Sequence, residues 1–238
     1  MSEKILIPLS ILIAGLLVGV GLYMTKDPKI IEKQPLAEKL SPKQEKISIV
    51  DPKKDHIIGN FEKAKIFVVE YADLECPGCK LYHQKTLLPL IEKYKNKEVA
   101  FVFRHFPFDK SYNGEEPLHP TAGTEAQASE CAALQGGDDI FFKYIGDVFE
   151  ETNSDGKFPL HRLPVIAEKY KLDKNKFIKC LKDKKTEKTV EDSYQEALRA
   201  GLESTPSVFI QIKNTNQSFP IVIEYNIIDK VLSEFLSK

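Results

Sequence analysis

The 238-residue chain has few cysteines and no excess of charge of either sign. Four cysteines are too few for a small domain held together by several disulfides, so each one has to be considered individually. The 34 lysines and arginines nearly balance 35 aspartates and glutamates, so the overall positive field of a nucleic-acid-binding protein is absent. The composition is neither collagen-like nor that of a coiled coil. With 42% hydrophobic residues, the chain can still bury a core.

The N-terminal part contains the longest apolar run, residues 5–24, which has no charged side chain. Twenty helical residues span roughly 30 Å, one hydrocarbon thickness. The run exceeds the core of an ordinary signal peptide and no Ala-x-Ala-like site follows it, so a retained transmembrane anchor is favoured over a cleaved signal segment. Residues 1–4 are a short flank. Residues 25–52, rich in Lys, Glu, Pro and Gln, predict a flexible tether.

The remaining residues, 53–238, have the pattern of one α/β domain. Apolar runs rich in β-branched and aromatic residues predict strands, and longer periodic segments predict helices. The expected order is strand, helix, strand, a helical block over about residues 115–201, two strands and a final helix. The expected strands are 65–71, 99–106, 207–212 and 221–223; the expected helices are 76–95, 121–135, 139–151 and 227–236, with shorter ones ending near Cys180 and Gly201.

The segment Cys76-Pro77-Gly78-Cys79 stands where the first strand gives way to a helix. A thiolate at a helix N-terminus is stabilised by free N–H groups and by the positive end of the helix dipole. Two intervening residues let the second thiol close a disulfide across one helical turn. The pattern therefore predicts thiol–disulfide exchange, with Cys76 as the exposed nucleophile and Cys79 as the buried resolving thiol.

Two other interpretations of the cysteine pair are open. A structural zinc site would need four ligands, whereas Cys76, Cys79 and His83 supply three, and the chain has no second Cys-x-x-Cys. Two unreactive buried cysteines would not require Pro and Gly at a helix start. We therefore expect no metal and no organic cofactor beyond a redox-active Cys76–Cys79 disulfide.

Two further features fit an exchange site. Glu70 lies on the predicted central strand, where a charged residue is costly unless it has a task, and a buried carboxyl group there could take the proton of Cys79. The alternative is an exposed glutamate on the strand face. Thr205-Pro206 stands directly before the returning strand, where a cis proline would leave backbone free to pair with an extended substrate.

Together these features resemble the DsbA-like thiol:disulfide oxidoreductases of the thioredoxin superfamily, of the membrane-anchored bacterial type. The likeness runs from about residue 55 to the C-terminus and includes residues 103–107 (FRHFP), 119–120 (HP) and 130–136 (ECAALQG). It implies a thioredoxin fold with an inserted α-helical domain, preceded by an N-terminal transmembrane helix. It also implies the site: Cys76 and Cys79 as the catalytic pair with Pro77 and Gly78 between them, Glu70 as the buried acid, and Thr205 and Pro206 as the loop facing substrate.

The remaining cysteines, Cys131 and Cys180, lie on predicted helices of the inserted block. In some relatives cysteines at similar places form a structural disulfide, and the alternative is two buried apolar thiols on neighbouring helices. Such a disulfide presupposes an oxidising compartment. The five histidines have no partners at metal-ligand spacing and are interpreted as structural or surface residues.

The resemblance implies disulfide transfer to secreted or membrane protein thiols, with a membrane redox partner for recycling and no nucleic acid. Reductase or isomerase activity with the same residues is one alternative, and a redox-inert peptide-binding module is another. Lysines after residues 5–24 would place the domain in the cytoplasm by the positive-inside rule, but the cysteine chemistry favours the extracytoplasmic side. We therefore expect a monomeric, single-pass cell-membrane protein, or a secreted one if the segment is cleaved.

Overall fold

A computed structural model describes residues 46–109, 117–215 and 217–237 of the chain. Its five strands form one sheet in the order β1-β3-β2-β4-β5. The parallel pair β2 and β3 lies at the centre, and every other neighbouring pair is antiparallel. The strands are β1 (His56–Gly59), β2 (Ile66–Ala72), β3 (Val99–His105), β4 (Ser207–Ile212) and β5 (Ser218–Pro220).

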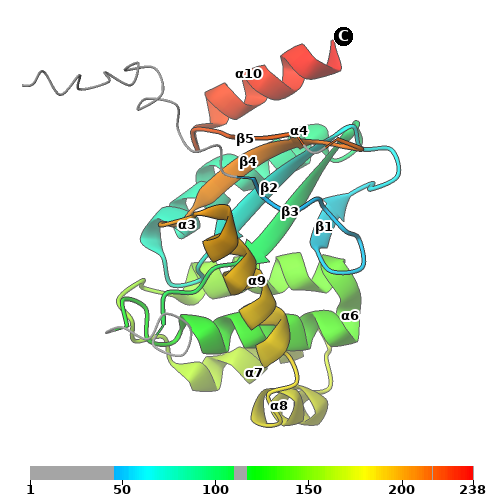
Figure 1. Cartoon of the computed structure of the whole chain (residues 1–238). Helices are drawn as coiled ribbons and strands as arrows, with labels where there is room; N and C mark the ends of the chain where they lie inside the picture. Colours follow the sequence, from blue (N-terminus) through cyan, green and yellow to red (C-terminus); the bar gives the residue numbers. More distant parts are fainter. Residues whose placement is uncertain (1–45, 110–116, 216, 238) are drawn as a thin grey trace, which may run out of the picture. The chain divides into compact units, whose positions relative to one another are not determined.

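The helix after β2 joins the parallel strands as a βαβ unit. It comprises α3 (Pro77–Tyr82), a π-helical turn (His83–Leu87) and α4 (Leu88–Tyr94), where a single helix was predicted over residues 76–95. The inserted block contains α6 (Ala122–Glu151), α7 (Leu163–Lys169), α8 (Lys174–Lys182) and α9 (Glu187–Ala200), and α10 (Tyr225–Leu236) ends the fold. Figure 1 shows α6, α7 and α8 gathered beyond one end of the sheet.

The two predicted helices 121–135 and 139–151 are the halves of α6. Gly137 lies between them with φ of 68°, a left-handed conformation that interrupts the helical path. The halves differ in composition, because alanines fill the first and aromatic residues the second. The composition therefore predicted the two helices, and they meet at a kink at Gly137.

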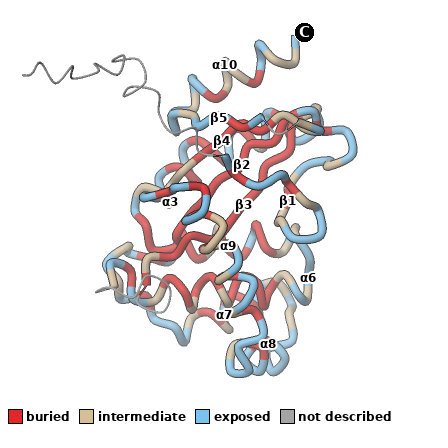
Figure 2. Tube along the Cα trace, viewed as in Figure 1, coloured by how far each residue is buried: buried red, intermediate tan, exposed pale blue. Residues whose placement is uncertain are grey.

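Both faces of the central strands β2 and β3 are buried, as their red tubes in Figure 2 show. Along β2, Ile66 and Val68 face α4 and α10, whereas Phe67, Val69 and Tyr71 face α9 and the segment before β1. This alternation follows from the two-residue period of a strand. A third cluster joins the carboxyl ends of β2 and β3 to the helical block. The cysteine pair belongs to this third cluster, where the sheet and the insertion meet.

Three sequence predictions need correction. Ile47 and Val50, assigned to the tether, are 7% and 4% exposed and pack in the core, so the domain begins before residue 53. Strand β1 was not predicted, because four residues beside a glycine give too short a pattern. The last strand lies at Ser218–Pro220 and not at 221–223, since Pro220 lacks an N–H and suits the end of an edge strand.

The predicted anchor, residues 5–24, lies outside the described residues, as does most of the predicted tether. Within residues 46–109, 117–215 and 217–237, no helix has the length and apolar character needed to cross a membrane.

Candidate active site

The cysteine pair occupies the turn between β2 and α3. Cys76 is the N-cap of α3, with an extended backbone (φ −72°, ψ 122°), and Pro77 is the first helical residue, where a missing N–H costs nothing. The backbone N–H of Cys79 donates to the Cys76 sulfur at 3.4 Å. The N-cap position thus directs a helix N–H at the first sulfur, as the sequence predicted.

The two thiols differ strongly in environment. Cys79 is fully buried, as predicted, whereas Cys76, predicted to be exposed, is only 7% exposed because the Thr205–Pro206 loop lies against it. A hydrogen bond from the Cys79 thiol, supported by the Cys79 backbone N–H, lowers the pKa of Cys76 to about 6. Burial, together with that same hydrogen bond, raises the pKa of Cys79 well above its usual range. At neutral pH the reduced pair therefore holds a thiolate at Cys76 and a protonated thiol at Cys79.

The loop before β4 faces Cys76. The peptide bond between Thr205 and Pro206 is cis, as the sequence predicted. The Cys76 sulfur lies 3.4 Å from the Thr205 carbonyl oxygen, to which the thiol donates when it is protonated. A Cβ atom built on Gly78 would lie 3.3 Å from Cδ of Pro206, so the residue between the cysteines also contacts this loop closely. Residues 129 positions apart in the chain therefore form one surface around the reactive sulfur.

Glu70 lies on β2 with 1% exposure, so the alternative of an exposed strand-face glutamate is wrong. Neither carboxyl oxygen has a hydrogen-bond partner. Burial, and to a smaller extent the charge of Cys76, raises the pKa of Glu70 to about 8. The charge of Glu70 in turn adds to the raised pKa of Cys79. The structure therefore places a carboxyl group that can hold a proton where it interacts electrostatically with both thiols.

Sequence reasoning missed a second set of ionisable residues at the site. His119 Nδ1 lies 2.8 Å from Oδ2 of Asp73, three residues before Cys76. Glu75 and Glu125 are fully buried nearby, and the Thr121 backbone N–H donates to Glu75 while its hydroxyl donates to Glu125. The signal in the sequence for these ionisable residues was the pair of acids, Asp73 and Glu75, just before Cys76. Their partners could not be found in the sequence, because they come from the segment that enters α6.

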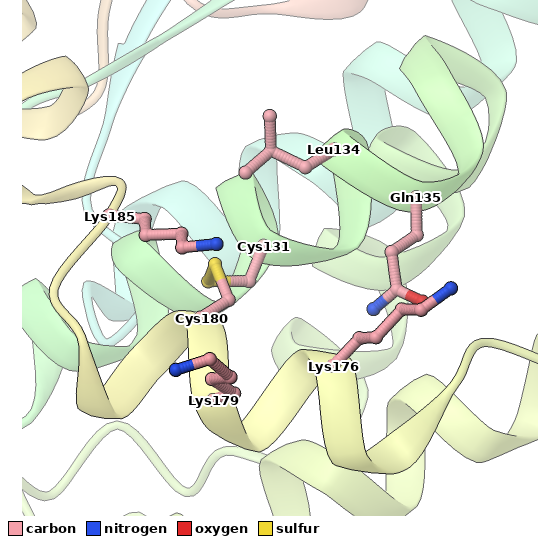
Figure 3. A pocket seen from close by; sticks show the side chains of 7 residues that line it. All are labelled: Cys131, Leu134, Gln135, Lys176, Lys179, Cys180 and Lys185. Atoms are coloured by element: carbon pink, nitrogen blue, oxygen red, sulfur yellow. A yellow bond between two sulfur atoms is a disulfide. The ribbon is translucent and has the colours of Figure 1, made fainter.

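The other two cysteines, Cys131 on α6 and Cys180 on α8, form a disulfide with a Cα–Cα distance of 6.0 Å. It lies beside an open pocket of about 180 Å³, shown in Figure 3. The pocket is also lined by Leu134, Gln135, Lys176, Lys179 and Lys185. The disulfide clamps two helices of the insertion and lies in the same hydrophobic cluster as Cys76 and Cys79.

The zinc alternative finds no support in the position of His83. Its buried ring packs against Phe149, with ring centroids 5.0 Å apart, and burial lowers its pKa to about 4. Across the residues that the structure describes, no three His, Cys, Asp or Glu side chains are grouped to hold a metal ion. The chemistry of the site is therefore that of two thiols, a buried acid and a backbone loop.

The sequence of this chain matches a known protein family. A family model described as thioredoxin matches residues 51–222, well over half of the chain. The chain belongs to the thioredoxin family. The predicted α/β thioredoxin fold with an inserted helical domain is confirmed.

Several solved structures are similar to this chain in fold. Oxidised BdbD from Bacillus subtilis gives a TM-score of 0.66 at 18% identity, over 82% of this chain and 98% of BdbD. For alpha-DsbA1 from Wolbachia pipientis the TM-score is 0.63 at 24% identity, over 79% and 94%. DsbA2 from Pseudomonas aeruginosa gives 0.61 at 24% identity, over 80% and 98%. At such identities the likeness establishes the fold.

Curated relatives by sequence are much longer than this chain. The Na(+)/H(+) antiporter NhaA 1 of Mycolicibacterium vanbaalenii is 28% identical over 163 residues, which are 68% of this chain and 24% of the antiporter. NhaA 3 of Salinispora tropica is 32% identical over 161 residues, 68% of this chain and 22% of that protein. The chain thus spans less than a quarter of these relatives, and the likeness concerns that share of them alone.

Proposed function

We propose that this chain is a protein thiol:disulfide oxidoreductase that introduces disulfides into other proteins. The observation that carries the proposal is the asymmetry of the cysteine pair. Cys76 has a lowered pKa and some exposure beside the cis Thr205–Pro206 bond, whereas Cys79 is fully buried with a raised pKa. A nucleophile that forms a mixed disulfide and a protected thiol that resolves it need these two environments.

The oxidising reaction uses the residues in order. A substrate thiolate attacks Sγ of Cys76 in the Cys76–Cys79 disulfide, and Cys79 leaves as a thiolate. Protonated Glu70 supplies the proton that Cys79 takes up. A second substrate thiolate then attacks the substrate sulfur of the mixed disulfide and releases the Cys76 thiolate. The substrate gains one disulfide, the enzyme gains two electrons, and an external oxidant must restore the pair.

The loop that contains Pro206 suits a protein substrate. The Thr205 carbonyl oxygen lies 3.4 Å from the Cys76 sulfur, so an extended chain that pairs with this loop would bring its own sulfur next to Cys76. The proposed substrates are therefore reduced, incompletely folded protein chains.

The site of action in this proposal is outside the cytoplasm. The disulfide between Cys131 and Cys180 is of the kind that persists in oxidising compartments, and residues 5–24 are apolar enough for a membrane anchor. A membrane redox partner would then reoxidise the pair. A thiol reagent that cannot cross membranes tests this location, since it should label Cys76 in intact cells after the pair has been reduced with a reductant that also cannot cross membranes. Labelling only after lysis would contradict the location.

The direction of exchange is tested by the reduction potential of the pair, measured against glutathione in the full-length chain. A disulfide donor should give a value between ~−120 and −180 mV, and it should restore activity to reduced, unfolded ribonuclease. A potential near ~−270 mV would assign the same residues to a reductase.

Matched variants separate exchange from simple binding. Cys76→Ser should abolish turnover, whereas Cys79→Ser should accumulate a mixed disulfide with substrate because the resolving thiol is missing. The variant with Cys131→Ser and Cys180→Ser should keep turnover, since that disulfide lies in the insertion. Retained peptide binding without any exchange in the unaltered chain would identify a redox-inert binding module instead.

A further inference from the structure

A carboxylate lies in the same turn as the reactive sulfur. Asp73 is 1% exposed, its backbone carbonyl accepts from the Cys76 N–H at 3.1 Å, and its side chain accepts from the N–H of Glu75 at 2.8 Å. Its negative charge raises the pKa of Cys76, opposing the effect of the Cys79 hydrogen bonds. A buried carboxylate and a thiolate in one turn repel each other unless a cation accompanies them.

His119 is placed to be that cation. Its Nδ1 lies 2.8 Å from Oδ2 of Asp73, and its backbone N–H donates to the Phe108 carbonyl at 3.0 Å. The Phe108 N–H donates to the same Asp73 oxygen at 2.7 Å. Asp73 therefore holds the ring through Nδ1, the Phe108 carbonyl holds the His119 backbone, and the His119 side chain retains only 10% exposure. Solvent screens a charge in such a position poorly.

This inference rests on the proposed exchange function and assigns a residue to the same site. We propose that protonated His119, held by Asp73, offsets the Asp73 charge and stabilises the Cys76 thiolate. His119 acts on the sulfur through the electrostatic field and not by contact, so it is a positioning residue. No charged side chain lies between the two cysteines, and the charge comes instead from the segment that enters α6.

The surrounding groups favour the charged imidazole. Desolvation lowers the pKa of His119, but Asp73, Cys76 and Glu75 together raise it above its usual value. On α6, Glu125 has a pKa raised to about 9 by burial and is therefore neutral at pH 7. Asp109, in the segment after β3, accepts from the Gly123 N–H. The groups in the turn before α3 thus favour the protonated form of His119, and Glu125 on α6 is uncharged.

This arrangement links the protonation of His119 to the redox state of the cysteine pair. Oxidation of Cys76 to the disulfide removes the thiolate charge, so His119 holds its proton less tightly in the oxidised chain than in the reduced chain. Nuclear magnetic resonance titration of the His119 ring in both redox states of the full-length chain measures this difference. The expected result is a lower pKa in the oxidised chain. Equal values in the two states would overturn the proposal.

The decisive substitution is His119→Asn. The asparagine amide can donate to Asp73 in place of Nδ1 but carries no charge. We expect a higher pKa for Cys76, followed by ultraviolet thiolate absorbance, and an equilibrium constant with glutathione that shifts about tenfold, or ~30 mV, towards the enzyme disulfide. Asp73→Asn should shift the Cys76 pKa downward. The matched control is His161→Asn, an exposed histidine, which should change neither quantity.

These measurements use glutathione and need no protein substrate. A chain that equilibrates with glutathione but never oxidises a protein would overturn the proposed function and leave the role of His119 standing. An unchanged Cys76 pKa in a folded His119→Asn variant would overturn the role of His119 alone. Should that variant fail to fold, the titration of the unaltered chain still decides.

Discussion

At the scale of single residues, the buried carboxyl group of Glu70 lowers the stability of the fold but lies where it can exchange protons with the thiols. Its carboxyl group is fully enclosed, and neither oxygen is hydrogen-bonded. A buried acid without a partner destabilises a fold more as it becomes charged. Its position on β2, on the same face as Val68 and below α3, explains why it is tolerated, since the neighbouring thiols exchange protons during the reaction.

We expect Glu70→Gln to stabilise the reduced chain progressively as pH rises. The folded-state pKa of about 8 lies above the unfolded value near 4.5, so the unaltered protein loses stability between these pH values, by roughly 3 kcal/mol between pH 5 and 8. The variant lacks this loss. Urea unfolding at both pH values measures it, and comparing the two cancels any constant cost of burying the amide.

The same variant should transfer disulfides more slowly, because Cys79 would have to leave without a proton donor. Stopped-flow kinetics of oxidation by the preformed enzyme disulfide would show this. A Glu70→Gln variant with unaltered kinetics and no stability gain at pH 8 would remove Glu70 from the mechanism.

At the scale of elements, a buried ionic cluster fastens the insertion to the sheet. His56 on β1 lies 2.8 Å from Asp138 and 3.1 Å from Glu130, both on α6, and His105 on β3 lies 3.3 Å from Glu130. Despite burial, the hydrogen bonds with Asp138 and Glu130 raise the pKa of His56 to about 9. Despite burial, the bonds from both histidines lower the pKa of Glu130 to about 2.

Glu130→Gln should therefore destabilise the fold in a pH-dependent way. The His56 contribution is complete below pH 6.5 and is lost as pH rises through about 9; the Glu130 contribution is complete above pH 4.5 and is lost as pH falls towards 2. The expected loss is ~2–4 kcal/mol near pH 5.5 and less near pH 9.5, from urea unfolding. Exposed Glu234 provides the control, since Glu234→Gln should have little effect at either pH.

The disulfide between α6 and α8 acts within the insertion. It closes a loop with a sequence separation of 49, which corresponds to about 3–4 kcal/mol in the chain-entropy model. Replacing Cys131 and Cys180 together by serine should lower the unfolding free energy by that amount. Since the disulfide joins α6 to α8 and Cys76 caps α3, we expect the glutathione equilibrium of Cys76 to stay unchanged. A shift in both quantities would show that the two disulfides are coupled.

At the scale of the whole molecule, the segment before β1 completes the core. Ile47 and Val50 pack against the face of the sheet that α9 also covers. The Val50 N–H donates to Gln211 at 2.8 Å, and the Gln211 amide donates back to the Ser48 carbonyl at 3.0 Å. The folded domain therefore starts within the lysine-rich stretch that composition assigned to a linker.

Two truncated chains test this boundary. A chain that begins at Gln44 should unfold with the same free energy as the full-length chain, since the compact unit starts there. A chain that begins at Lys53 loses two buried aliphatic side chains and should be about 3 kcal/mol less stable. Equal stability of the two truncated chains would place residues 44–52 outside the fold.

The sequence alone determined the local features. Apolar runs rich in β-branched and aromatic residues, a proline at a helix start and the change from an alanine-rich to an aromatic helix act within a few residues, so they predicted β2, β3, α3 and the two halves of α6. The reactive pair followed from Cys76-Pro77-Gly78-Cys79 because helix capping is local chemistry. The likeness of Thr205-Pro206 and of the helical insertion to a known family supplied the rest of the prediction.

Only the tertiary structure decided which distant groups meet. The burial of Glu70 depends on α3 and α10, the contact of Asp73 with His119 joins segments 46 positions apart, and β1 pairs with a strand that it could not have predicted by itself. These tertiary contacts set the protonation state of each group, because its pKa depends on desolvation and on charges from distant parts of the chain. The sequence thus specifies which atoms react, and the fold specifies which of them carry a proton.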